Sequence, residues 1–96
     1  MAVDAEEPAD AVAALVRTVP GVAGLHPGMF GEVGTYLPGR RVDGVRITDD
    51  VIEVHITVWS DAAVRDTAAR VRSAVSAAFR DTPVDVTVED IAAGSD

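Results

Sequence analysis

The chain contains no cysteine and no lysine, few aromatic residues and no long apolar run. Without cysteine it has no disulfide framework, no thiolate metal site and no thiol redox chemistry. No apolar run approaches the roughly 18–20 residues of a membrane-spanning helix, so we expect no direct membrane insertion. Residues 1–10 are acidic and lack the basic-then-apolar pattern of a signal peptide. We therefore expect a cytoplasmic protein.

The composition allows only a small core. Hydrophobic residues make up 48% of the 96 residues, but aromatic residues only 4%, and most of the apolar side chains are alanine and valine. This length fits one domain, and such a chain buries only about 60–65% of its unfolded surface. Because the core is thin, self-association would help to stabilise the protein.

The net charge of −8 is distributed unevenly. Residues 1–16 carry −4 and residues 81–96 carry −5, whereas residues 17–80 hold all eight basic residues, each an arginine, against seven acidic ones. Phosphate contacts need concentrated positive potential. We therefore expect no binding to nucleic acid or to anionic lipid.

Two helices are predicted within one domain over residues 8–91, between a disordered acidic N-terminus (1–7) and a frayed tail (92–96). The first begins near Pro8 and ends at Pro20-Gly21. Its apolar face is formed by Val12, Leu15, Val16 and Val19. The second, about 20 residues long by its apolar periodicity, begins after the N-cap Ser60 and ends before Pro83. Asp66 and Arg70 are spaced in it for an i,i+4 ion pair.

The clearest strand signal is a hairpin, in which apolar and polar residues alternate on both sides of Asp49-Asp50. The alternation pairs Ile47 with Ile52 and Val45 with Val54 on the core face, and Arg46 with Glu53 on the outer face. Shorter strands are predicted at 22–25, 33–37 and 84–88, with a turn at 37–40. A crossover from residue 52 to 88 makes two strands parallel. We expect an α/β two-layer sandwich, with a mixed sheet of three to five strands and two helices on one face.

A glycine-rich segment is the main candidate for function. Seven of the eight glycines fall between residues 21 and 44, which indicates positive φ angles or close backbone approach. A connection this long in a small domain usually has a task of its own. We predict that this segment and the outward Trp59 make protein contacts. Phe30, Tyr36 and Leu37 either meet a partner or pack the segment onto the domain. The full set of candidate contact residues is Phe30, Tyr36, Leu37, Arg40, Arg41 and Trp59.

Two of these features allow other interpretations. Arg40-Arg41 beside Gly39 can capture a carboxylate or phosphate, and the alternative function is therefore a small anion-binding or ligand-binding domain. The same two arginines can instead form a solvated or salt-bridged surface. Trp59 is either an interface anchor or folds over the sheet edge against Arg46 or Thr57. An RNA-binding module is disfavoured by the acidic ends and by a sheet face without aromatic pairs.

No catalytic set is evident, and we expect neither enzymatic activity nor a cofactor or metal. The run 28–31 lacks the Gly-Lys-Ser/Thr ending of a phosphate loop, and no serine lies in a Gly-x-Ser-x-Gly context. His26 and His55, with Asp43 or Glu53, lack the spacing of a metal site. A turn beside Pro27 for His26, and a cross-strand pair for His55, are the simpler expectations.

Three runs, Pro20–Gly28, Phe30–Glu32 and Leu37–Val45, together with the strand at 54–56 and the ending at 84–91, resemble actinobacterial members of the alkaline shock protein family of envelope stress response proteins. The resemblance covers roughly residues 10–91. It implies a small cytoplasmic α/β protein with no established enzymatic activity, associated with cell-envelope stress and held at the membrane by a separate membrane-anchored partner. We therefore expect a non-enzymatic envelope stress response protein that acts by self-association or by docking to such a partner. It supplies no catalytic motif.

Overall fold

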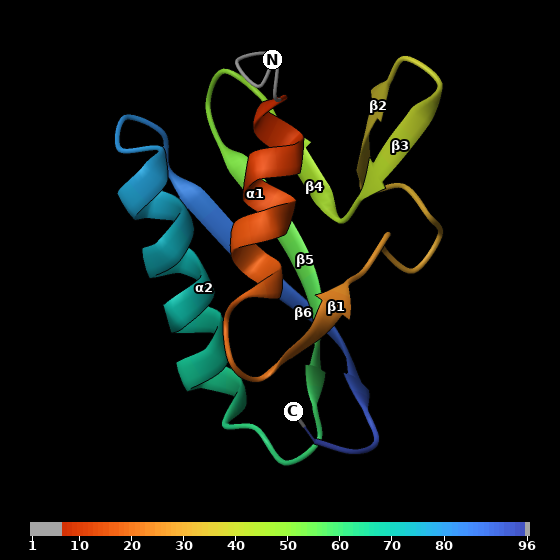
Figure 1. Ribbon diagram of the computed structural model, residues 1–96, viewed down its shortest axis with the longest axis vertical. Coiled ribbons are helices and arrows are strands. Elements are labelled where there is room, and N and C mark those ends of the chain that lie inside the picture. The colour runs from red at the N-terminus through yellow and green to blue at the C-terminus, as the bar shows by residue number, and fades with distance from the viewer. Residues whose placement is uncertain (1–6, 96) are drawn as a thin grey trace.

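The structure, a computed structural model, describes residues 7–95. The elements follow in the order α1 (Pro8–Arg17), β1 (Val22–Leu25), β2 (Gly34–Leu37), β3 (Arg40–Asp43), β4 (Val45–Ile47), β5 (Ile52–Trp59), α2 (Val64–Ala78) and β6 (Val84–Ala92). Both helices pack on one face of the main sheet (Figure 1). The predicted α/β two-layer sandwich with a mixed sheet is confirmed. The predicted disorder of residues 1–7 lies, except for Glu7, outside the described residues.

The main sheet is built around β5. Strand β4 pairs antiparallel with it in the predicted register, with Val45 opposite Val54 and Arg46 opposite Glu53. Strand β1 pairs antiparallel with the second half of β5, and β6 runs parallel to β5 along its whole length. Since β6 occupies one edge of β5, β1 and β4 lie end to end along the other edge (Figure 1).

Strands β2 and β3 form a separate two-stranded sheet that projects from the main body (Figure 1). Leu37 pairs with Arg40 across the turn Pro38-Gly39, where Gly39 has a φ of 74°. Proline followed by glycine with positive φ is the pattern of a type II turn. The predicted turn is therefore found, but β3 was not predicted, because its four residues include a single apolar one, Val42.

The core is made of small aliphatic side chains from both layers. Ile52, Val54, Ile56 and Val58 of β5 are all buried, as the alternation predicts. The prediction that Ile47 is buried with them is wrong: this side chain, at the end of the short strand β4, is 36% exposed. In α1 the buried stripe is Ala9, Val12, Ala13 and Val16, and Leu15 is only half-buried.

Helix α2 is shorter than predicted, with 15 residues, and it begins at Val64 rather than directly after Ser60. The Ser60 N–H donates to the Ala92 carbonyl at 2.8 Å, so sheet pairing continues past Trp59 and delays the helix. The Ser60 hydroxyl bonds to the backbone of Gly94 instead of capping α2. Within residues 7–95 the predicted Asp66–Arg70 pair is not formed.

Candidate functional site: an exposed aromatic surface

Three large apolar side chains stand out from the glycine-rich segment and the β2–β3 hairpin. Phe30 is 94% exposed, Tyr36 80% and Met29 71%, the highest values for large apolar side chains among the described residues. We call these three residues the aromatic surface. Such side chains are normally withdrawn from water, and exposed apolar groups that gather in one region mark interaction sites.

Hydrogen bonds hold the backbone that carries Met29 and Phe30. The Val33 N–H donates to the Pro27 carbonyl at 2.7 Å, and the Gly31 N–H to the Gly28 carbonyl at 3.1 Å. The Glu32 carboxylate accepts from the Phe30 N–H at 3.0 Å. The pKa of Glu32 is lowered because its carboxylate accepts hydrogen bonds from its own N–H and from that of Phe30. The loop is thus an ordered platform at neutral pH.

Arg41 joins this loop to the hairpin. Its guanidinium donates to the Gly31 carbonyl at 2.6 Å, forms an ion pair with Asp43 at 3.3 Å, and lies 5.2 Å from the centroid of the Tyr36 ring. A cation at this distance from an aromatic face is attracted to the ring. The side chain of Arg41 also fills the space that a Cβ on Gly34 would occupy. A glycine at position 34 is therefore required for Arg41 to reach the loop.

Arg40 makes a different contact, with α1. Its two terminal nitrogens bond to the two carboxylate oxygens of Asp10 at 2.8 and 2.6 Å. This bidentate pair lowers the pKa of Asp10 and raises that of Arg40, in both cases chiefly through the hydrogen bonds. Since Arg40 and Arg41 both have carboxylate partners within the protein, the geometry favours a salt-bridged surface over the alternative anion site.

The structure therefore separates the six predicted contact residues. Arg41 contacts both the Tyr36 ring and the loop that carries Phe30, and Arg40 is the next residue on the same hairpin. Leu37 is half-buried and packs against the core. Trp59 lies elsewhere, at the far end of β5 opposite Ala92, and it is half-buried beside Gly94, where an added Cβ would come within 3.3 Å of its ring. Met29 was not predicted as a contact residue. The signal that could have identified it is the pair Met29-Phe30, two large apolar side chains enclosed by Gly28 and Gly31.

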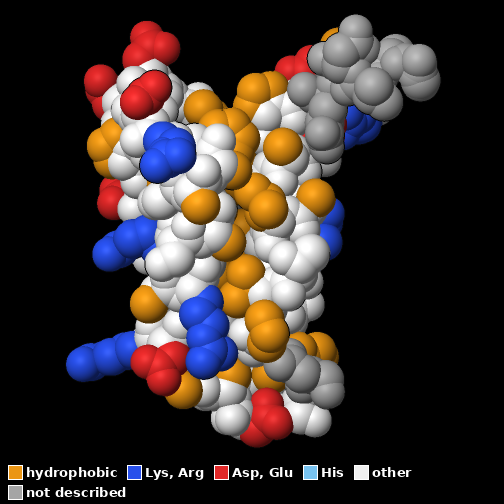
Figure 2. Space-filling model, turned by 60° about the vertical axis from the view of Figure 1, so that its left-hand side comes forward, with side chains coloured by type: hydrophobic (Ala, Val, Ile, Leu, Met, Phe, Trp, Pro, Cys, Tyr) orange, Lys and Arg blue, Asp and Glu red, His pale blue; other side chains and the backbone are white. Residues whose placement is uncertain are grey.

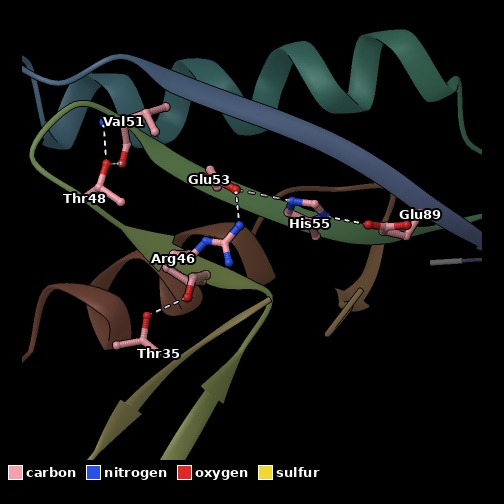
Figure 3. Close-up of polar contacts among 8 residues, drawn as sticks. Thr35, Arg46, Thr48, Val51, Glu53, His55 and Glu89 are labelled. Atoms are coloured by element: carbon pink, nitrogen blue, oxygen red, sulfur yellow. Dashed lines mark hydrogen bonds and ion pairs between the residues drawn. The ribbon is translucent and has the colours of Figure 1, made fainter. Parts of the chain in front are cut away.

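The outer face of the sheet carries its own network of polar side-chain contacts. Arg46 lies 3.0 Å from Glu53, which is the predicted cross-strand pair, and His55 Nδ1 lies 2.6 Å from Glu89 Oε2 on β6 (Figure 3). Glu89 is the extra residue of a β-bulge between the pairs Ile56–Val88 and Thr57–Asp90. His55 has thus found the cross-strand partner that the sequence predicts for it. The polar side chains on this face therefore have hydrogen-bonding partners within the sheet.

His26 directly follows β1 and is not itself in a turn: its N–H donates to the His55 carbonyl at 2.9 Å, and its Nδ1 accepts from the Gly28 N–H at 3.0 Å. Within residues 7–95 no group of three or more histidine, cysteine, aspartate or glutamate side chains is arranged to hold a metal ion. In the same residues no helix combines the length and apolar character needed to cross a bilayer. No protein-family model, curated protein or solved structure matches the chain.

Proposed function

We propose that the protein is a non-enzymatic interaction module of the envelope stress response, acting in the cytoplasm by self-association or by docking to a membrane-anchored partner. The observation that carries the proposal is the exposure of Phe30, at 94%, on a loop whose backbone is already held by hydrogen bonds. A contact residue on an ordered platform loses little conformational freedom on binding. The link to envelope stress rests on the family resemblance of the sequence.

The aromatic surface has the composition of a contact site. Aromatic residues and arginine are enriched at the centres of interfaces, and methionine adapts to the shape of a partner. Arg41 connects the hairpin to the loop, because it contacts both the Tyr36 ring and the Gly31 carbonyl. A partner can therefore bury Phe30, Tyr36 and Met29 without first ordering the segment that presents them.

The test replaces the exposed aromatic side chains of Phe30 and Tyr36 by alanine and measures self-association and partner capture. Phe30→Ala with Tyr36→Ala should leave the stability within about 0.5 kcal/mol of wild type at each site, because both side chains are exposed. It should weaken self-association, or capture of the membrane-anchored partner from membrane extracts, by about 2–4 kcal/mol. Analytical ultracentrifugation over a range of concentrations, followed by pull-down, gives both values.

A matched control removes an exposed apolar side chain elsewhere. Ile91, 52% exposed on β6, lies outside the aromatic surface, so Ile91→Ala should associate as the wild type does. If the double variant also sediments and is captured like wild type, the aromatic surface is not the contact site and the proposal fails.

A further inference from the structure

Residues 7–95 contain a single sulfur atom, and it lies in the aromatic surface, in the side chain of Met29. The sequence has no cysteine, and its other methionine is Met1, which lies outside the described residues. Met29 is 71% exposed, although methionine is one of the residue types most often buried. Because the thioether is exposed, an oxidant reaches the sulfur without any unfolding of the protein.

The turn that carries Met29 gives no reason of its own for a large apolar side chain. The Gly31 N–H donates to the Gly28 carbonyl at 3.1 Å, so these residues close a β-turn with Met29 and Phe30 at its two central positions. Such positions are usually taken by glycine, proline, asparagine, aspartate or serine, which favour the turn itself. Two large apolar side chains at the tip of a turn therefore point to contact with another molecule.

Met29 makes no contribution to the core. It belongs neither to the cluster of buried side chains nor to the half-buried ones that pack against this cluster. The loop between β1 and β2, which carries Met29, extends away from the two helices and lies beside the projecting hairpin (Figure 1). A chemical change at this side chain therefore alters the contact surface and leaves the fold intact.

The helical side of the molecule offers no comparable target for oxidation. Figure 2 shows apolar side chains along the seam between α1 and α2, with charged side chains beside them. Apart from Pro8, the apolar residues of both helices are alanine, valine and leucine, which mild peroxide does not oxidise. Trp59 reacts with peroxide far more slowly than a thioether does, and it is half-buried. Among residues 7–95, peroxide is thus directed to Met29.

We propose that Met29 is an oxidation site at which a peroxide switches off the aromatic surface, an inference that rests on the contact function proposed above. The thioether sulfur attacks one oxygen of the peroxide, and the O–O bond breaks as the S–O bond forms. The other oxygen takes the proton of the transferred oxygen and leaves as water or an alcohol. The sulfur loses two electrons, the peroxide gains them, and the product is methionine sulfoxide.

The sulfoxide is polar where the contact requires an apolar group. Its oxygen is a hydrogen-bond acceptor, and burying it against an apolar partner without a donor is unfavourable. The adaptable, polarisable thioether that suits methionine to contact surfaces is lost at the same time. Methionine sulfoxide reductases, which use a dithiol as reductant, return the sulfur to the thioether, so the change is reversible.

The test treats the full-length protein with hydrogen peroxide and measures both the modification and the association. Peptide mass mapping should find one added oxygen on the peptide that contains Met29, which is distinct from the peptide that contains Met1. In the sedimentation and capture assays of the aromatic surface, the oxidised protein should associate about tenfold more weakly. Treatment with a methionine sulfoxide reductase should restore association. Circular dichroism and the melting curve should stay those of the untreated protein.

Two variants assign the effect to this sulfur. Met29→Leu keeps an apolar side chain of similar size without sulfur, so it should associate like wild type before and after peroxide. Met29→Gln places a polar group at about the position of the sulfoxide and should associate about tenfold more weakly without peroxide. Both variants retain Met1. If peroxide weakens Met29→Leu as much as wild type, another residue is responsible and the proposal is overturned.

The proposal is also overturned if peroxide leaves Met29 unmodified, or if the sulfoxide form associates like the untreated protein. Phe30→Ala with Tyr36→Ala separates these results from a failure of the proposed function. If this double variant loses association while the oxidised protein keeps it, the aromatic surface is the contact site and only the control by oxidation fails. If the double variant associates like wild type, the proposed function fails and this inference fails with it.

Discussion

Gly44 shows how closely single residues fit in this protein. It lies between β3 and β4 with a φ of 80°, and its carbonyl accepts from the His55 N–H at 2.8 Å. An added Cβ would lie 2.8 Å from the His55 carbonyl oxygen and 2.9 Å from the His26 nitrogen. Both neighbours are backbone atoms of paired strands and cannot move aside. Gly44 is therefore required by conformation and by space together.

We expect Gly44→Ala to lower the free energy of unfolding by about 2–4 kcal/mol, from backbone strain and steric overlap combined. Gly39 provides the control, because its φ is 74° but an added Cβ would meet nothing within 4 Å. Gly39→Ala should cost only the conformational part, about 1 kcal/mol. Urea unfolding of both variants measures the difference. Equal losses would mean that the close approach at Gly44 contributes nothing.

Single residues also make contacts that the sequence did not predict. Trp59 points to the outer face, as the alternation of β5 predicts, yet it is half-buried beside the backbone of Gly94. Ser60 has the chemistry of an N-cap, but its hydroxyl bonds to Gly94. In both cases the partner lies in the C-terminal segment, which no local pattern connects to residues 59 and 60.

At the scale of elements, the projecting hairpin is tied to the helical layer by Arg40 and Asp10. The pair joins β3 to the first turn of α1. Because Arg40 holds the pKa of Asp10 below its usual value of 3.8, ionised Asp10 stabilises the folded protein above that pH. The contribution is lost as the pH falls through the lowered pKa of the folded state.

Asp10→Asn should therefore be less stable than wild type at neutral pH, and this difference should shrink as the pH falls through the lowered pKa of Asp10 and vanish once the wild-type carboxyl is itself protonated. Thermal unfolding of both proteins across this pH range measures the difference. Asp49→Asn, in the exposed β4–β5 turn and without an ion pair among residues 7–95, is the control and should show no such trend. A constant gap at all pH values would show that the carboxylate charge of Asp10 is not responsible.

The β4–β5 hairpin was the element best predicted from sequence. The core face and the outer face of the hairpin predict the same register, since pairing Val45 with Val54 also places Arg46 opposite Glu53. Strand β3 and the start of α2 were missed. In β3 a single apolar residue gives no periodicity, and the start of α2 depends on the pairing of Ser60 with Ala92.

At the scale of the whole molecule, stability rests on a core of mostly valine and isoleucine. Val54 lies at its centre, fully buried and flanked by Val45 on β4 and Val86 on β6. Few large side chains are present to compensate for a local loss. The molecule therefore has little reserve against a charge introduced into the sheet.

Val54→Asp should unfold the protein. An unpaired carboxylate in the core costs several kcal/mol, much of the about 5–15 kcal/mol that stabilises a small domain. Ala69→Asp adds the same charge on the exposed side of α2 and should cost less than about 1 kcal/mol. Far-UV circular dichroism and a melting curve decide the matter. A Val54→Asp protein that melts like wild type would mean that the faces of β5 are misassigned.

The sequence by itself determined the elements whose signal is local: the presence of helix α1, the alternation of β5, the Pro-Gly turn and the glycine-rich segment. Each depends on residues a few positions apart, where period and backbone preference act. The tertiary structure decided which charged groups are paired and which are free. Arg40 meets Asp10 across 30 positions and His55 meets Glu89 across 34. Only the packing of the layers brings such residues together.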